Sequence, residues 1–230
     1  MTHPIPTGCP PIDDLLGGGF ERGTVTQVYG PPAAGKTNLA LGGTVEAVAE
    51  GNRALYIDTE GLSIDRFEQL ARARVGEDGV DDLASRVMIT EALDFDEQAE
   101  AVRDATEVAS QIDLIVLDSA TGFYRLEREN DDEGEALRTV VRQVTHLLSL
   151  ARRYDLAVVI TNQVFSDPEG DRTRALGGHT LSHWSGAVLR LERFRGGNRR
   201  ATLEKHRSKP VGESVRFRIV EGGMVAGGEP

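Results

Sequence analysis

Short apolar runs alternate with segments of helical spacing along most of the chain. Compact apolar runs rich in β-branched residues are typical of strands that are buried on both faces. The strands that this pattern predicts cover residues 24–29, 53–58, 86–90, 112–118 and 156–161. The helices that it predicts between them cover residues 36–50, 94–109 and 133–154. This alternation favours an α/β core in which most strands are parallel.

The pattern changes after Gly186. Three segments alternate between apolar and polar positions and are separated by glycine-rich turns, at residues 188–194, 200–206 and 215–220. Such alternation predicts an antiparallel meander. We therefore expect a central, mostly parallel, mixed sheet with antiparallel strands at its C-terminal end.

Charge and composition qualify this picture. Hydrophobic residues make up 39% and charged residues 27% of the sequence, which is typical of a globular protein. The net charge is −11, and 23 of the 26 basic residues are arginine, because lysine occurs only at Lys36, Lys205 and Lys209. This composition favours a salt-adapted (halophilic) protein, with an acidic protein from a GC-rich genome as the alternative. In a salt-adapted protein the mean charge reflects the habitat, so that only local basic clusters bear on nucleic-acid binding.

The sequence indicates a cytoplasmic protein without a membrane partner. Its apolar runs are far shorter than the roughly 20 residues that cross a bilayer. Residues 1–6 lack the basic segment and apolar core of a secretion signal. Cys9 is the only cysteine, so an intramolecular disulfide is impossible and a reducing compartment is expected.

One segment matches the pattern G-x-x-x-x-G-K-[ST] in full. It consists of Gly30, Pro31, Pro32, Ala33, Ala34, Gly35, Lys36 and Thr37. A predicted strand precedes it and a predicted helix follows, so that backbone N–H groups and a helix N-terminus would surround a phosphate. Lys36 would reach the β- and γ-phosphates of ATP, and the Thr37 hydroxyl would be a Mg²⁺ ligand. We therefore predict a P-loop that binds ATP and Mg²⁺.

Polar residues follow three other predicted strands, at the sheet edge where α/β proteins bind ligands. Asp118 ends one strand and would orient the Mg²⁺ shell. Glu60 lies just past a second strand and is the candidate general base, with a plain loop carboxylate as the alternative. Gln163 follows a third strand and would contact the γ-phosphate or its water, unless it is a simple turn amide. Asp113 begins its strand at the opposite edge and is expected to be solvated.

These motifs, in this order, resemble those of the RecA/RadA recombinase superfamily. The resemblance begins before the P-loop, at residues 7–8, 12–19 and 21–24, and continues at residues 56–61, 117–119, 160–163 and 177–179. It implies one RecA-like P-loop ATPase domain over residues 1–230. The short core, the Gly-Gly-His turn at 177–179 and residues 205–208 with Pro210 resemble an archaeal paralogue of RadA.

The resemblance also implies two DNA-binding loops, at residues 122–135 and 164–176. The residues that would stack on bases or contact phosphates are Tyr124, Arg125, Arg128, Arg172 and Arg174. Four carboxylates between residues 127 and 132 share the first loop, so a solvated loop of mixed charge is the alternative.

A pair of basic residues resembles those that related ATPases project into a neighbouring subunit's site. Lys205 and Arg207 would there stabilise the charge that develops on the γ-phosphate, which implies a homo-oligomer. Without such a neighbour, the pair is only a charged strand end.

Two departures bear on function. A full recombinase of this superfamily has an N-terminal helix-hairpin-helix domain and a linker with an aromatic polymerisation residue, whereas the core lead-in begins here by Thr7. The second loop is also short, which argues against filament formation and strand exchange of the RadA type. The resemblance then implies an accessory protein of homologous recombination and DNA repair that binds ATP and single-stranded DNA, assists RadA and is a weak, DNA-dependent ATPase. Two other functions stay open: a full strand-exchange recombinase, and a KaiC-like signalling ATPase that acts through protein partners without DNA.

Overall fold

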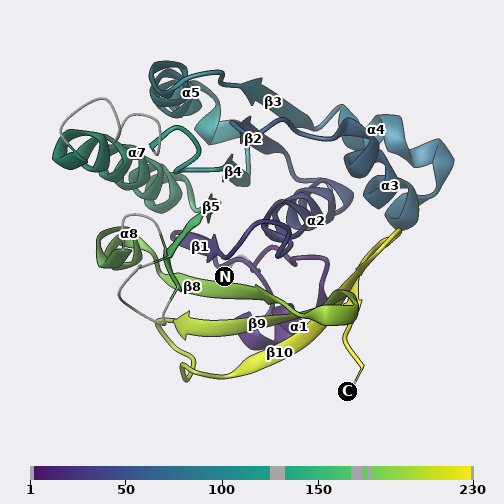
Figure 1. Ribbon diagram of the computed structural model, residues 1–230. Helices are drawn as coiled ribbons and strands as arrows, with labels where there is room; N and C mark the ends of the chain where they lie inside the picture. Colours follow the sequence, from purple (N-terminus) through teal and green to yellow (C-terminus); the bar gives the residue numbers. More distant parts are fainter. Residues whose placement is uncertain (1–2, 125–132, 167–172, 176–177, 229–230) are drawn as a thin grey trace.

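The computed structural model describes residues 3–124, 133–166, 173–175 and 178–228. A nine-stranded sheet runs through the molecule in the order β11-β10-β9-β8-β1-β5-β4-β2-β3 (Figure 1). From β8 to β3 all neighbouring strands are parallel. The parallel strands are β1 (Val25–Tyr29), β2 (Ala54–Asp58), β3 (Val87–Glu91), β4 (Leu114–Asp118), β5 (Ala157–Asn162) and β8 (Ala187–Arg193). The predicted α/β fold with a mostly parallel, mixed sheet is confirmed.

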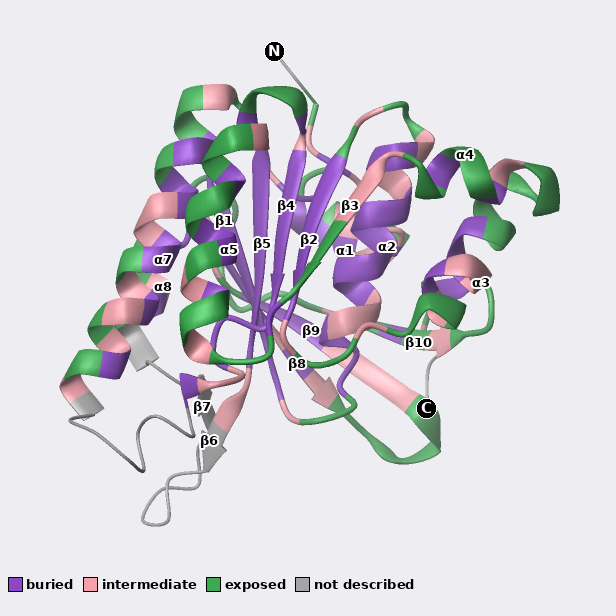
Figure 2. Cartoon of the chain, turned by 90° about the horizontal axis from the view of Figure 1, so that it is seen from above, coloured by how far each residue is buried: buried purple, intermediate pink, exposed green. Residues whose placement is uncertain are grey.

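Helices cover both faces of the sheet (Figure 2). One layer consists of α1 (Pro10–Leu16), α2 (Lys36–Ala49), α3 (Ile64–Val75) and α4 (Val80–Ala84), and the other of α5 (Phe95–Val108), α7 (Glu133–Tyr154) and α8 (Gly178–Trp184). Because both faces are covered, every residue of β1, β2, β4 and β5 is buried. Among the described residues, short 3₁₀ turns occur at Glu77–Gly79, Ala109–Gln111 and Arg195–Gly197. Within the described ranges no helix is long and apolar enough to span a membrane.

Two helices begin where side chains cap them. The Ser63 hydroxyl accepts a hydrogen bond from the backbone N of Arg66 at the start of α3, and Asp94 accepts one from the backbone N of Glu97 at the start of α5. Glu97 in turn accepts a hydrogen bond from the backbone N of Leu93 at 2.8 Å. Such caps satisfy N–H groups that a helix leaves unpaired in its first turn.

The antiparallel strands at the C-terminal end extend the sheet beyond β8. They are β9 (Asn198–Lys205), β10 (Ser214–Val220) and β11 (Gly223–Ala226). A separate two-stranded ribbon pairs β6 (Val164–Ser166) with β7 (Thr173–Ala175). The sequence predicted the meander but placed this ribbon in a loop.

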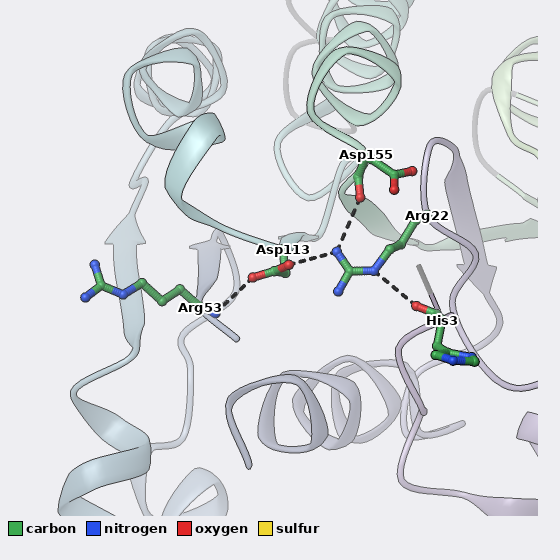
Figure 3. Close-up of polar contacts among 5 residues, drawn as sticks. All are labelled: His3, Arg22, Arg53, Asp113 and Asp155. Carbon is green, nitrogen blue, oxygen red and sulfur yellow. Dashed lines mark hydrogen bonds and ion pairs between the residues drawn. The ribbon is translucent and has the colours of Figure 1, made fainter. Parts of the chain in front are cut away.

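An ion pair at the amino ends of the parallel strands corrects the expectation that Asp113 is solvated. Arg22 donates hydrogen bonds to Asp113 Oδ1 at 2.8 Å, to the Asp155 carbonyl at 3.3 Å and to the His3 carbonyl at 3.1 Å (Figure 3). Asp113 Oδ2 also accepts one from the backbone N of Arg53 at 3.4 Å. The carboxylate therefore connects the segments that enter β1, β2 and β4.

Candidate nucleotide-binding and catalytic site

The predicted P-loop connects β1 to α2, and its backbone demands small residues. Ala33 and Gly35 have φ values of 60° and 108°, in the left-handed region that favours glycine. A Cβ added to Gly30 would lie 2.3 Å from the Leu191 carbonyl oxygen, so β8 leaves room for glycine alone. The loop leads directly into the N-terminus of α2, which begins at Lys36. This curled backbone before a helix N-terminus is a setting in which N–H groups bind a phosphate.

Lys36 is directed back into this loop. Its ammonium group donates to the carbonyls of Gly30 at 3.0 Å and Pro31 at 3.3 Å. The residue is only 9% exposed, and burial lowers its pKa, while the nearby Glu60 and Asp118 carboxylates act in the opposite direction. A buried cation held by neutral carbonyls and facing two acids is suited to exchange these contacts for an anionic ligand.

Asp118 lies at the carboxyl end of β4 and is 2% exposed. Its carboxylate accepts hydrogen bonds from the Tyr56 hydroxyl at 2.7 Å and from the hydroxyl of Thr161. The Thr37 hydroxyl lies close enough to this carboxylate to lower its pKa. Burial raises the pKa of Asp118, and these three hydroxyls oppose the rise. A carboxylate next to a P-loop hydroxyl provides the hard oxygen ligands that Mg²⁺ prefers.

Glu60 is held by the strand end that precedes it. The Asp58 carboxylate accepts hydrogen bonds from the backbone N–H groups of Glu60 and Gly61, both at 3.1 Å, and from that of Leu62. This turn presents the Glu60 side chain on the exposed side of the sheet edge, in the direction of the P-loop lysine that its charge influences.

Two further side chains converge on Glu60. Its Oε1 accepts a hydrogen bond from Ser119 Oγ at 2.7 Å and another from Gln163 Nε2 at 2.8 Å. The Gln163 backbone N donates to Thr121 Oγ1 at 3.2 Å, which fixes the start of the chain beyond β5. The structure thus brings Glu60 and Gln163 together, as a shared site requires.

Sequence reasoning missed four residues of this site. Asp58, Tyr56, Ser119 and Thr161 all contact Asp118 or Glu60, or shape the turn that carries Glu60. Each lies within two residues of a predicted strand end, and that position was the available signal.

The two predicted trans-acting residues occupy different settings. Lys205 donates to the carbonyls of Ser182 at 2.7 Å and His183 at 3.1 Å, at the C-terminal end of α8. Burial and the neighbouring Arg207 lower its pKa. Arg207 is exposed. Within a single chain, Lys205 therefore stabilises a helix end, and Arg207 is the more accessible of the two.

The predicted DNA-binding residues are only partly described. Tyr124 is 4% exposed and packs in the core that includes α5 and α7, where its ring is inaccessible to a base. Arg174 belongs to β7, opposite Phe165. The predictions for Arg125, Arg128 and Arg172 lie outside the described residues.

Comparison with known proteins assigns this chain to a family. The chain matches the Rad51 family model over residues 2–226. It is 61% identical over 228 residues to the DNA repair and recombination protein RadB of Halobacterium salinarum, across 98% of this chain and 95% of that relative. The protein of the same name from Methanococcoides burtonii is 43% identical over 222 residues, across 95% of this chain and 96% of that relative.

A solved structure agrees with these relatives. The crystal structure of a RadB recombinase superimposes with a TM-score of 0.84 at 36% identity, and the match covers 97% of this chain and all of the other. The expected resemblance to the RecA/RadA superfamily is confirmed. The chain belongs to the Rad51 family, among the RadB proteins of DNA repair and recombination.

Proposed function

We propose that this protein is an ATP- and DNA-binding accessory protein of homologous recombination that assists RadA and hydrolyses ATP weakly, in a DNA-dependent manner. The observation that carries the ATP part is the convergence of Lys36, Asp118 and Glu60 at one edge of the sheet. The names of the relatives, which describe DNA repair and recombination, support the DNA part.

The P-loop residues from Gly30 to Thr37 would hold the phosphates. Lys36 would leave the carbonyls of its own loop and pair with the β- and γ-phosphates. Thr37 and Asp118 would hold Mg²⁺, which neutralises phosphate charge when bound.

Glu60 would accept the proton of the attacking water. Ser119 and Gln163 occupy one of its carboxylate oxygens, which fixes the direction of the other. Gln163 would also sense the γ-phosphate, because it connects Glu60 to the segment that follows β5. Slow hydrolysis is consistent with Lys205 being engaged by α8, since the isolated chain then lacks one cation for the transition state.

The DNA part rests on the arginines that the family resemblance assigns to the two loops. Arg125, Arg128, Arg172 and Arg174 would contact phosphates, which is the charge chemistry that dominates affinity for nucleic acid. In an acidic chain such contacts need local basic residues, and each of these loops supplies two arginines.

The test is binding of fluorescently labelled single-stranded DNA, with and without ATP, at several high KCl concentrations. We compare the wild type with Arg125→Ala/Arg128→Ala and with the control Arg103→Ala/Arg152→Ala, which removes the same charge from exposed sites on α5 and α7. Weaker binding by the first variant alone supports the proposal. Absence of binding by the wild type overturns it in favour of a signalling ATPase with protein partners, and an ATP-dependent filament on DNA favours a full recombinase.

The assistance to RadA needs its own test. Purified RadA is assembled on single-stranded DNA in the presence of this protein or of its Lys36→Met variant. A shorter lag before RadA assembles, seen with the wild type only, supports the proposal. An unchanged lag contradicts the partnership while leaving DNA and ATP binding intact.

A further inference from the structure

One face of the C-terminal sheet extension has an unusual charge. Along β10 the residues that point to one side, including Phe217, are covered, whereas Ser214, Arg216, Arg218 and Val220 on the other side are exposed. We call the exposed side, with the β8–β9 turn, the arginine face; it consists of Phe194, Arg195, Arg200, Arg216 and Arg218. Figure 1 shows β9 and β10 at the margin of the sheet, away from α5 and α7.

The local charge opposes that of the whole chain. The protein carries a net charge of −11, yet residues 193–203 hold four arginines and no acid, and β10 holds two more arginines and no acid. Arg195, Arg216 and Arg218 form no ion pair within the described part of the chain. Three cationic side chains of this face thus lack an acidic partner in the described part of the chain, whereas Arg200 pairs with Glu192.

The register places like charges side by side. Arg216 of β10 lies directly opposite Arg200 of β9. Glu192 already pairs with Arg200 at 2.9 Å, so the charge left unbalanced at this position is that of Arg216. A ligand of opposite charge would pair with Arg216.

An aromatic ring accompanies these cations. Phe194 is 46% exposed, and the Arg200 guanidinium lies over its ring at 5.1 Å from the centroid. Glu192 holds Arg200 in this position through hydrogen bonds of 2.9 Å. Phe194 and Arg200 therefore form a cation–π pair that Glu192 holds in place, beside Arg195, Arg216 and Arg218.

We infer that the arginine face binds the sugar–phosphate backbone of single-stranded DNA, with Phe194 as a stacking surface for a base. This inference rests on the proposed function and adds a contact surface on β9 and β10 to the loop arginines that the function assigns to DNA. Alternate residues of a strand are about 7 Å apart, so Arg216 and Arg218 can contact successive phosphates of an extended strand. An exposed ring favours nucleic acid over an acidic protein, because bases stack on aromatic side chains whatever their sequence.

The test measures affinity for labelled oligo-dT by fluorescence anisotropy over a series of KCl concentrations. Arg216→Ala/Arg218→Ala is compared with the charge-matched control Arg103→Ala/Arg152→Ala. We expect the first variant to bind about tenfold more weakly, and the slope of log K against log[KCl] to become shallower by about 1.4, or about 0.7 for each lost phosphate contact. The control should retain the wild-type slope. Thermal unfolding of each variant verifies that it is folded.

Phe194→Leu separates stacking from charge. It should weaken binding about fivefold or more without changing the salt slope, because stacking releases no counterions. If Arg216→Ala/Arg218→Ala binds DNA as the control does, the inference is overturned while the proposed function stands, and an acidic protein becomes the better partner for this face. If the wild type binds no DNA at any KCl concentration, the proposed function fails as well.

Discussion

Ser119 Oγ donates a hydrogen bond to Glu60 Oε1 across 2.7 Å, although 59 positions separate them in the chain. The contact exists because β2 and β4 are neighbours in parallel register, with Asp58 opposite Asp118. Each residue of the contact lies just past the end of its strand. The register thus places a hydroxyl beside the candidate base and leaves Glu60 Oε2 as the oxygen that can accept a proton from water.

Glu60→Gln should lower the rate of ATP hydrolysis by about 100-fold or more, because loss of a general base costs about 10²–10⁴-fold. ATP binding should be unchanged, since no P-loop contact is removed. Ser119→Ala should lower the rate by about fivefold, the effect expected from one hydrogen bond of about 1 kcal/mol. Single-turnover hydrolysis and nucleotide titration measure the two quantities. A Glu60→Gln variant with the wild-type rate would remove Glu60 from the mechanism.

Lys36→Met should abolish the stabilisation of the protein by ATP with Mg²⁺. In the wild type, a ligand at 100 times its Kd stabilises the fold by about 2.7 kcal/mol, which thermal unfolding detects as a higher Tm. Without ligand the variant should be as stable as the wild type or more so, because burial penalises the ammonium group. Lys209→Met, at an exposed lysine, is the control and should keep the full response to ATP.

Local sequence signals predicted much of the site. The P-loop follows from one continuous motif, and the positions of Asp118, Glu60 and Gln163 follow from the ends of three apolar strands. These inferences need only that parallel strands end at a common edge. Most predicted strand and helix bounds also agree with the structure within two residues.

Contacts that depend on register or on distant segments were not predictable. The Tyr56 hydroxyl reaches Asp118 because β2 and β4 are adjacent, which the sequence does not specify. Asp113 was expected to be solvated because it begins its strand at the opposite sheet edge, and its partner Arg22 is 91 positions away in the chain. Lys205 was interpreted as a cation for a neighbouring subunit's site or as part of a charged strand end, since nothing in its own strand reveals the carbonyl end of α8 beside it.

Asp13 should make stability depend on pH. Burial raises its pKa to about 6, whereas the unfolded chain loses this proton near 3.8. The folded state therefore holds the proton more tightly, so its contribution to the free energy of unfolding is full below pH 3.8 and is lost as the pH rises to about 6. Each unit of difference between the folded and unfolded pKa corresponds to about 1.4 kcal/mol for a fully shielded group. Solvent screening at this partly exposed carboxyl reduces the contribution of the whole shift to about 1 kcal/mol.

The Asp13→Asn variant isolates this contribution, because the amide oxygen can still accept the hydrogen bond from the Thr7 backbone N. Relative to the wild type, the variant should gain about 1 kcal/mol in free energy of unfolding between pH 4 and pH 7. Urea unfolding at both pH values measures the difference. An equal difference at both would show that Asp13 has an ordinary pKa.

Asp113→Ala should destabilise the fold by about 1–3 kcal/mol, since it leaves the Arg22 guanidinium without its carboxylate. The Arg22 side chain is 12% exposed, so water replaces the lost partner poorly. Asp104→Ala removes an exposed carboxylate of α5 that has no ion pair within the described residues, and it should change stability by less than about 0.5 kcal/mol. Equal losses in the two variants would indicate a general charge effect.

Lys205→Ala should lower the Tm, because Lys205 binds the last carbonyls of α8 and a cation there is worth about 1 kcal/mol. Arg207→Ala should leave the Tm unchanged, since Arg207 is exposed. Its effect should instead appear in ATP hydrolysis, and only at protein concentrations at which subunits associate. This difference separates a structural cation from one that acts on a neighbour.

Mixing two inactive variants tests that action directly. Arg207→Ala retains its own Glu60 but lacks the cation for a neighbour, whereas Glu60→Gln retains the cation but lacks the base. If Arg207 acts in trans, a mixed assembly contains sites with Glu60 from one subunit and Arg207 from the other, and hydrolysis rises above that of either variant alone. If Arg207 acts only within its own chain or not at all, no site gains a cation from a neighbour and the mixture stays as slow as its components, which would exclude action of Arg207 on a neighbouring subunit.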